Sequence, residues 1–386
     1  MAYLYEILTN TYLLVFVAIL APVLLSLRMY PVIIHLVKSK NLMDEPVDRS
    51  THTIKTPTLG GVGMFISFSL TLITLGMVLD LSQTDLLKLL AVVAASITLM
   101  FLGIKDDLLG LAPKKKFMVQ LVASLMVIIL ADLRIISFEG IFGLEVLPYY
   151  ISVVFTLFVF LLIINAYNLI DGLDGLAGSV ALLSSLSFGT FFFINGRYLF
   201  VLISFVLIGA LLGFLRYNLS SHRKIFMGDS GSMFVGFLLA FQAVGFLSYN
   251  SIIEHPVTNI EAPIMGMAIL SYPLLDTLRV FAIRISQKRS PFRADRNHIH
   301  HRLLNLGLTH KKTTLVIATL NIVIITLAFL IRDLYIHVQL YIMVLAVPLI
   351  YISPWLVKRT EGRMKLRIPK KRSLAIIRAR IMSFLG

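Results

Sequence analysis

Long apolar runs separated by short polar stretches dominate this chain. A helix needs about 20 mostly apolar residues to cross a hydrocarbon core about 30 Å thick, and eleven segments meet or approach that length. The predicted spans are residues 10–36, 58–79, 86–104, 116–133, 148–168, 176–194, 199–215, 231–248, 263–285, 313–331 and 338–356. The pattern predicts an all-α, polytopic membrane protein of about eleven transmembrane helices.

Composition supports lipid as the main solvent of this chain. Of its 386 residues, 58% are hydrophobic and 14% are charged, whereas soluble domains are roughly half apolar and a quarter charged. No polar block is long enough to fold separately, so we expect one transmembrane domain over residues 1–356 and a basic tail at 357–386. The absence of cysteine excludes disulfides and thiolate ligands, so any metal must use oxygen or imidazole.

Positive charge predicts the orientation of the spans. Lys and Arg concentrate in residues 38–57, 105–116, 216–230 and 286–312 and beyond residue 357, whereas the opposite loops contain only Arg134, Arg197 and Arg332. The positive-inside rule then places the N-terminus outside and the C-terminus in the cytoplasm, in a cell inner (plasma) membrane. Because the basic residues are spread over every inner loop, the net charge of +15 indicates contact with anionic lipids and not with nucleic acid. The tail is either a basic amphipathic helix on the inner leaflet or an unstructured basic segment.

Two polar segments lie where predicted spans three and five end at the cytoplasmic face. Asp106 and Asp107 are adjacent and precede a lysine triplet that ends at Lys116. Adjacent carboxylates repel each other, so they bind a cation, act as a base or lie in water at a solvated helix end.

The second polar segment runs from Asn165 to Gly178. Asn165, Asn168 and Asp171 are three residues apart and share one helical face. Gly172 lets the backbone approach a ligand closely, and Asp174 adds a further carboxylate. Amide and carboxylate oxygens suit magnesium, although a capped turn between two helices is the alternative.

Two further polar segments lie on the same predicted side. Asp229 and Ser230 are expected to form the N-cap of a span, where a divalent ion on Asp229 would allow pyrophosphate to bind the helix N-terminus. The alternative is simple N-capping. The second segment is rich in histidine and arginine, which favours phosphate contact and leaves a histidine metal site or a surface loop as alternatives. Its candidates are His298, His300, His301 and Arg302.

The first inner loop contains two prolines and ends in a double glycine. Lys55 and His52 are its candidates for nucleotide or phosphate contacts. An ordinary hairpin between two helices explains the same composition.

These segments together resemble the polyprenyl-phosphate N-acetylhexosamine-1-phosphate transferases, the family that includes MraY, WecA and TagO. The matching segments are Asp106-Asp107 with Lys116, residues 165–175, residues 226–232 and residues 298–303. They match in order, spacing and membrane side over almost the whole chain. The pattern Asp44-x-Pro-x-x-Arg-x-x-His52 is most similar to WecA and TagO. One departure is His222-Arg223 before Lys224, where members often have Pro-Ala.

The resemblance implies a role for each matching residue. Asp229 would bind Mg²⁺, or Mn²⁺, with help from Asn168, and Lys116 would face the pyrophosphate. Lys55, Gly172, Asp174 and Phe226 would contact uridine, with Asp171 in the same substrate-binding segment. His298, His300, His301 and Arg302 would meet the phosphates and the sugar, and Asp106 and Asp107 match the acidic pair usually assigned to catalysis.

The implied reaction transfers a sugar-1-phosphate, GlcNAc-1-phosphate, from UDP-GlcNAc to undecaprenyl phosphate, releases UMP and begins cell-envelope glycopolymer synthesis. An MraY-like transfer of phospho-MurNAc-pentapeptide and a transporter of lipid-linked substrates are the alternatives. The sequence leaves open a one-step or a covalent two-step displacement, and also a homodimer. Motifs of the CDP-alcohol phosphotransferases and of UbiA-like prenyltransferases are absent from the chain.

Overall fold

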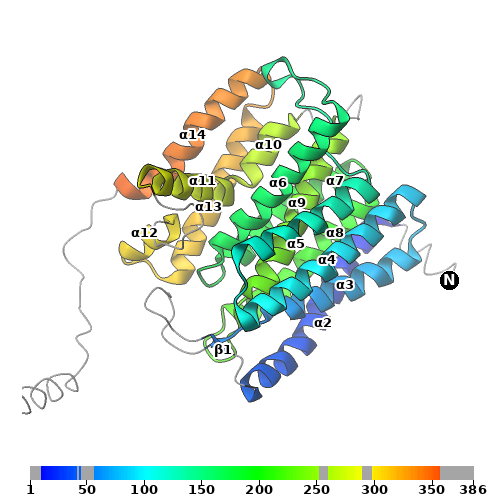
Figure 1. The fold of residues 1–386 in the computed structure, drawn as a ribbon, viewed down its shortest axis with the longest axis vertical. Helices are drawn as coiled ribbons and strands as arrows, with labels where there is room; N and C mark the ends of the chain where they lie inside the picture. Colours follow the sequence, from blue (N-terminus) through cyan, green and yellow to red (C-terminus); the bar gives the residue numbers. More distant parts are fainter. Residues whose placement is uncertain (1–9, 41–42, 45–55, 252–259, 289–297, 357–386) are drawn as a thin grey trace, which may run out of the picture.

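The computed structural model describes residues 10–40, 43–44, 56–251, 260–288 and 298–356, and Lys55, His52 and the basic tail lie outside these ranges. The described part is almost entirely helical (Figure 1). The helices are α2 (Thr11–Ser39), α3 (Gly60–Val78), α4 (Gln83–Leu109), α5 (Pro113–Leu125), α6 (Tyr149–Ile170), α7 (Leu176–Ile194), α8 (Tyr198–Asn218), α9 (Gly228–Asn250), α10 (Ala262–Ile269), α11 (Ser271–Ser286), α12 (Ile299–Asn305), α13 (His310–Leu330) and α14 (Ile336–Leu356). The minor elements are the π-helix η1 (Met126–Leu130), the 3-10 helix η2 (Ile141–Gly143) and an antiparallel pair of short strands, β1 (Met43–Asp44) and β2 (Thr56–Pro57).

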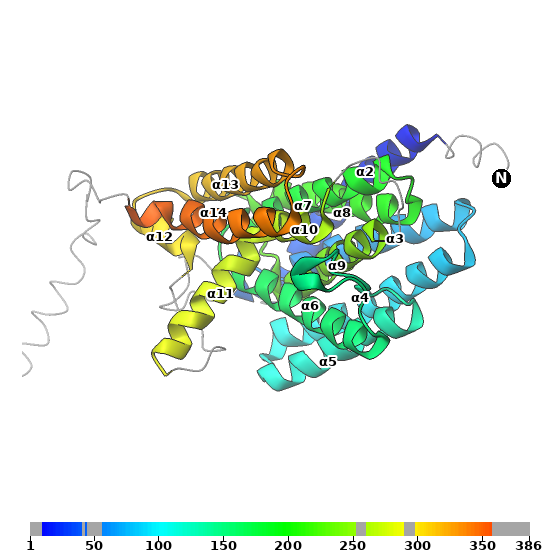
Figure 2. The same cartoon turned by 90° about the horizontal axis from the view of Figure 1, so that it is seen from above.

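Helix α9 forms the centre of the bundle and is surrounded by α3, α4, α6 and α7 (Figures 1 and 2). Along its most apolar 18 residues, 94% are buried, against 22% in the peripheral helix α2. Glycines permit this close packing: a Cβ on Gly61 of α3 would lie 2.1 Å from the backbone nitrogen of Gly231 on α9. The helix that carries Asp229 is therefore the most enclosed of the predicted spans.

The predicted all-α, polytopic membrane architecture is confirmed. Nine helices of the described residues are long and apolar enough to cross a membrane, and a bent pair would make a tenth. The predicted span 116–133 corresponds to α5 and η1, which follow each other directly from Pro113 to Leu130 and are not among these nine helices. Its apolar run begins only after Lys116 and ends before Asp132, so it is about 22 Å long at 1.5 Å per residue.

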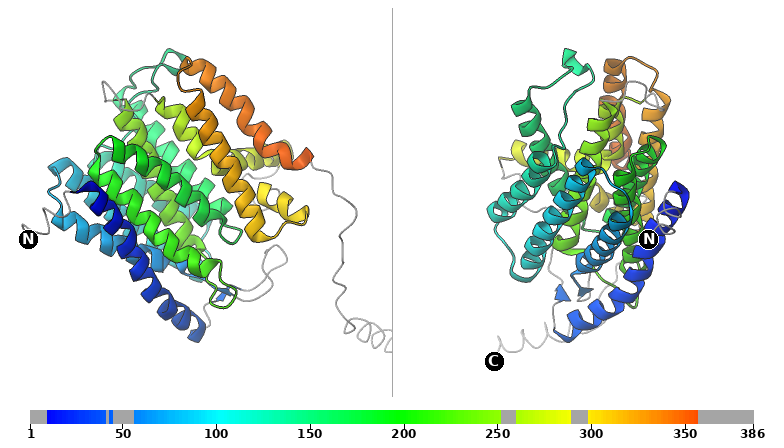
Figure 3. Two further views of the ribbon diagram at one scale, coloured as in Figure 1. Left: turned by 180° about the vertical axis from the view of Figure 1, so that it is seen from behind. Right: turned by 90° about the vertical axis from the view of Figure 1, so that its right-hand side faces the viewer.

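The predicted span 263–285 is broken into α10 and α11, which bend by 76° relative to each other. Pro273 lies in the first turn of α11, where its missing N–H costs no helical hydrogen bond. Figure 2 shows α11 leaving the bundle at an angle to its neighbours, and Figure 3 shows α13 and α14 side by side along one edge.

Polar segments gather at one end of the bundle. Helices α4, α6 and α8 end there, and α5, α7, α9 and α13 begin there, because the helices alternate in direction. The first inner loop is joined to the start of α9 by backbone hydrogen bonds, from Gly60 N–H to the Phe226 carbonyl and from Gly61 N–H to the Met227 carbonyl, both at 2.9 Å.

Candidate active site

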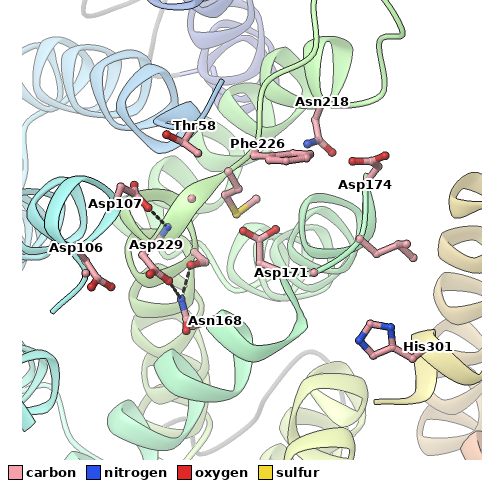
Figure 4. Close-up of a pocket in the computed structure, with 16 residues that line it drawn as sticks. Thr58, Asp106, Asp107, Asn168, Asp171, Asp174, Asn218, Phe226, Asp229 and His301 are labelled. Carbon is pink, nitrogen blue, oxygen red and sulfur yellow. Dashed lines mark hydrogen bonds between the residues drawn. The ribbon is translucent and has the colours of Figure 1, made fainter. Parts of the chain in front are cut away.

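A cavity of about 590 Å³ opens where these helix ends meet (Figure 4). Its walls come from α4, the turn between α6 and α7, the segment from the end of α8 into α9, and α12. The structure thus brings together four polar segments that lie far apart in the sequence. The predicted site residues that line the cavity are Asp106, Asp107, Asn168, Asp171, Gly172, Asp174, Phe226, Asp229 and His301.

Lys116 is not part of the cavity lining, but it bridges two carboxylates that are. Its ammonium group forms an ion pair with Asp106 and lies 3.3 Å from Oδ2 of Asp229. Asp106 also accepts a hydrogen bond from the N–H of Leu111 at 2.7 Å. One cation on α5 therefore compensates charge on both α4 and α9, and it lies where an anionic substrate would need positive charge.

Asn168 fixes the other oxygen of Asp229. Its amide nitrogen donates to Oδ1 of Asp229 at 2.6 Å and to the hydroxyl of Ser232 at 2.7 Å. The nitrogen of Asn168, and not its oxygen, faces Asp229 in this structure. Asn168 therefore orients the carboxylate that was expected to share a metal with it.

Asp107 caps the helix that carries Asp229. Its carboxylate accepts hydrogen bonds from the N–H groups of Asp229 at 2.7 Å and Ser230 at 3.1 Å. Gly228 is required at this junction, since its φ is 73° and a Cβ there would lie 2.7 Å from Oδ2 of Asp107. The expected Asp229–Ser230 N-cap is wrong in detail: the helix begins at Gly228, and the cap comes from α4.

The two aspartates of the α6–α7 turn have opposite electrostatic environments. Burial, together with the negative charges of Asp229, Asp107 and Asp174, raises the pKa of Asp171 to about 8. Burial also opposes ionisation of Asp174, but hydrogen bonds from His310 at 2.8 Å and Lys224 at 2.7 Å lower the pKa of Asp174 below its usual value. Asp174 is therefore a paired anion, whereas Asp171 faces the other carboxylates across the cavity (Figure 4).

Phe226 and Asn218 form the wall next to Asp174 (Figure 4). The ammonium group of Lys224 lies 5.0 Å from the centre of the Phe226 ring. Asn218 accepts a hydrogen bond from Gly175 N–H at 2.7 Å and donates to the Ile225 carbonyl at 2.9 Å, which ties α7 to the segment before α9.

No motif in the sequence pointed to Asn218 or His310. The available signal for Asn218 was a polar residue at the end of a strongly apolar helix. The sequence contained no signal for His310, because its contact with Asp174 joins residues 136 positions apart.

The three histidines of the 298–303 segment lie close together, with ring centres 4.4–6.2 Å apart, but differ in exposure to the cavity. His301 faces the cavity, whereas His298 and His300 are buried behind it. Burial lowers the pKa of His300 to about 3, so this imidazole is neutral. Arg302 lies on α12 but is not part of the cavity wall. Within this segment, the structure thus places only His301 where it could meet a ligand directly.

The residues around Asp229 fit a hard divalent cation. Carboxylates of Asp107, Asp171 and Asp229 lie close enough to perturb one another, and a cation would relieve that repulsion. No group of three or more His, Asp or Glu side chains among the described residues could enclose a metal ion. This is compatible with magnesium, which is usually held by one or two carboxylates and otherwise by water and substrate phosphates.

Comparison with known proteins identifies the family. The model of glycosyl transferase family 4 matches residues 89–247. The decaprenyl-phosphate N-acetylglucosaminephosphotransferase of Mycolicibacterium smegmatis is 36% identical over 290 residues, which are 70% of this chain and 71% of the relative. The chain belongs to glycosyl transferase family 4. This confirms the predicted resemblance and the predicted enzyme class, a glycosyl-1-phosphate transferase with several membrane spans.

Two further members of glycosyl transferase family 4 cover similar shares of the chain. A probable undecaprenyl-phosphate N-acetylglucosaminyl 1-phosphate transferase of Bacillus subtilis is 30% identical over 330 residues, 84% of this chain and 87% of the relative. The undecaprenyl-phosphate alpha-N-acetylglucosaminyl 1-phosphate transferase of Escherichia coli K12 is 27% identical over 284 residues, 72% of this chain and 74% of the relative. Both alignments extend well beyond the segment matched by the family model.

Proposed function

We propose that this enzyme transfers GlcNAc-1-phosphate from UDP-GlcNAc to a polyprenyl phosphate, undecaprenyl phosphate, with release of UMP. The observation that carries the proposal is the bridge from Lys116 to Asp106 and Asp229, two of the carboxylates that line the cavity. This arrangement supports the handling of phosphates through a lysine and a cation together. The names of the relatives support the polyprenyl phosphate and the GlcNAc-phosphate group.

The reaction needs neutralisation of charge more than a strong base. An oxygen of the acceptor phosphate attacks the sugar-linked phosphorus, and the bond from that phosphorus to the bridging oxygen breaks as UMP leaves with the electron pair. A phosphate monoester has a second pKa near about 6 and is already nucleophilic at neutral pH. Lys116 supplies positive charge beside the reacting phosphates, which is where most catalysis of phosphoryl transfer lies. Mg²⁺ held by Asp229, with Asp171 nearby, would supply further neutralisation when bound.

The cavity offers separate places for the parts of the donor. The ring of Phe226 and the 172–174 turn lie at one end and suit a uridine, and Asp229 lies towards the other and suits the pyrophosphate (Figure 4). Lys116 contacts Asp229 at that end. His301 faces the same space and suits the sugar or its phosphate. Asp107 is already bonded to two backbone N–H groups, so we assign it a structural role.

The charge distribution supports a cytoplasmic site in the plasma membrane. The loops that converge on the cavity are those rich in Lys and Arg, and the positive-inside rule then directs the cavity to the cytoplasm, with the N-terminus outside. UDP-sugars would reach the site from that side. The product would begin synthesis of a cell-envelope glycopolymer.

The test is an assay of the purified full chain with radiolabelled UDP-GlcNAc, undecaprenyl phosphate and Mg²⁺. We expect lipid-borne label and an equal amount of UMP. Release of UDP would indicate a plain glycosyltransferase and overturn the proposal. Transfer from UDP-MurNAc-pentapeptide, with none from UDP-GlcNAc, would replace it with the MraY-like reaction.

A further inference from the structure

One face of α11 holds the short helix α12, which carries the cavity histidine His301. Asp276 and Tyr272 are one helical turn apart and both are fully buried. A carboxylate oxygen of Asp276 lies 2.7 Å from Nδ1 of His298, and the hydroxyl of Tyr272 lies 3.3 Å from Nδ1 of His300. Two consecutive contacts of α11 thus fix the two buried histidines of α12.

Asp276 also caps α12. Its second carboxylate oxygen accepts a hydrogen bond from the N–H of Ile299 at 2.9 Å, at the first residue of the helix. The N-cap residue His298 makes no capping hydrogen bond with its own side chain. A helix of seven residues is too short to be stable alone. Helix α12 packs against α13 and α14, and the contact with Asp276 fixes its first turn. Arg279, 3.2 Å from Asp276, partly compensates the buried negative charge.

The buried histidines connect α11 to the cavity. His300 is 1% exposed, and a Cβ on Gly172 of the α6–α7 turn would lie 3.4 Å from its Nε2. The next residue, His301, faces the cavity. A shift of α12 would therefore move His301 relative to the α6–α7 turn, which holds Asp171 and Asp174.

The orientation of α11 is itself fixed by a polar network at the break after α10. Asn321 of α13 donates to the carbonyl of Ile269 at 3.2 Å and accepts from the hydroxyls of Ser271 at 3.2 Å and Tyr351 at 3.0 Å. This network replaces the helical hydrogen bonds lost at the break. Its polar groups are buried, so they favour one defined bend.

We infer that Asp276 and Tyr272 are positioning residues that act through α12 to hold His301 against the bound donor. This inference rests on the proposed function for its catalytic readout, but the position of α12 can also be measured without catalysis. Displacements of about 1 Å in a substrate-positioning group can cost about 100-fold in rate. The control is Thr277→Val, because Thr277 is buried beside Asp276 and its hydroxyl has no partner among the described residues.

The catalytic test is a double-mutant cycle on the full-length protein in detergent. We expect Asp276→Ala to lower kcat by about 10- to 100-fold. Asp276→Asn can still accept the hydrogen bond from Ile299 N–H, so it should lower kcat by less than about 10-fold. The control Thr277→Val should lower kcat by less than about 2-fold. In a His301→Ala background, Asp276→Ala should cost less than about 3-fold. An equal loss in both backgrounds would overturn the inference, since a general folding defect would act irrespective of His301.

The second test measures reactivity of the histidines with diethyl pyrocarbonate, read residue by residue by mass spectrometry. We expect His298 and His300 to be protected in the unmodified protein and in Thr277→Val, and to react at least about 5-fold faster in Asp276→Ala, because the capping hydrogen bond that holds them is lost. Tyr272→Phe, which removes only a hydroxyl, should expose His300 to a smaller degree. Unchanged reactivity in Asp276→Ala would overturn the inference even if no transfer activity were found. Absence of transfer with the expected reactivity pattern would contradict only the proposed function.

Discussion

The carboxylate of Asp107 on α4 lies 2.7 Å from the backbone nitrogen of Asp229 on α9 and accepts its hydrogen bond across 122 residues of sequence. Its neighbour Asp106 pairs with Lys116 and lies beside the side chain of Asp229. Two adjacent acids in one motif thus have separate tasks: one fixes the start of α9, and the other contacts the cation beside the site. The predictions that follow separate these tasks.

Asp107→Asn should retain far more activity than Asp107→Ala. The asparagine keeps one oxygen that can accept from the start of α9, whereas alanine leaves two buried N–H groups without their acceptor, at a cost of about 1–2 kcal/mol in the free energy of unfolding. We expect the transfer rate to fall by about 10-fold for Asn and by more than about 100-fold for Ala. Thermal unfolding in detergent would be measured on the same variants to report their stability. If Asn and Ala were equally inactive at unchanged stability, Asp107 would have a chemical role.

Asp229→Ala should abolish transfer and weaken binding of UDP-GlcNAc in the presence of Mg²⁺. The variant removes the carboxylate that contacts Lys116 and Asn168 and that we propose as the metal ligand. Binding can be followed by calorimetry with Mg²⁺ and with EDTA. We expect the unmodified protein to lose affinity in EDTA and the variant to be insensitive to it, and full activity in the variant would disprove the metal assignment.

Asp106→Asn should lower the rate by about 10- to 100-fold, by the same factor from pH 6 to 9. Asp106 is engaged by Lys116 and by Leu111 N–H, so it orients the lysine, and the acceptor phosphate needs no base above its second pKa of about 6. The measurement is a pH–rate profile of both proteins. A loss concentrated at low pH, where the acceptor is protonated, would instead identify Asp106 as a general base.

The sequence was sufficient to predict the site's location but not its internal contacts. Hydropathy and charge indicate which helix ends share a membrane side, so the meeting of Asp106, Asn168 and Asp229 at one end follows from counting spans. The short α5 does not change this result, because the segment still returns the chain to the opposite end of the bundle before α6.

Contacts between side chains depend on how helices rotate and bend, which hydropathy does not specify. The α10–α11 break is stabilised by Asn321, some 50 residues further along the chain. The pairing of His310 with Asp174 likewise requires α13 to pack beside α7. Neither contact leaves a periodic pattern in the sequence, and both determine where site residues lie.

Asp171→Asn should stabilise the metal-free protein while lowering its activity. The pKa of Asp171 is raised to about 8 in the fold and is about 3.9 in the unfolded chain, so the native state retains a proton that the unfolded state has lost. Stability contributed by this group is therefore greatest below about pH 4 and falls as the pH rises to about 8. Relative to the unmodified protein, the variant should gain a few degrees in Tm at pH 8 in EDTA. Mg²⁺ should reduce this difference, since a cation favours the ionised form; an undiminished difference would contradict a metal near Asp171.

Glu139, at the opposite end of the bundle from the cavity, should make the stability of that end depend on pH. Its carboxylate accepts from the amide of Asn250 at 2.9 Å and caps α10 through Ala262 N–H at 3.0 Å, and burial raises the pKa of Glu139 to about 7. Because the folded-state value lies above the unfolded one, the protonated form is favoured by folding. Stability from this group is complete below about pH 4.5 and is lost as the pH rises through about 7.

The measurement for Glu139 is Tm in detergent from pH 5 to 8 for the unmodified protein, Glu139→Gln and Glu145→Gln. Glu145 is an exposed glutamate of the same loop and serves as the matched control. Glu139→Gln removes the ionisable group, so its Tm should depend less on pH. Between pH 5 and 8, the fall in Tm of this variant should be smaller by about 2–4 °C than the fall in the other two proteins. Parallel curves for all three proteins would show that Glu139 does not titrate in this range, and that its link between the ends of α9 and α10 is independent of pH.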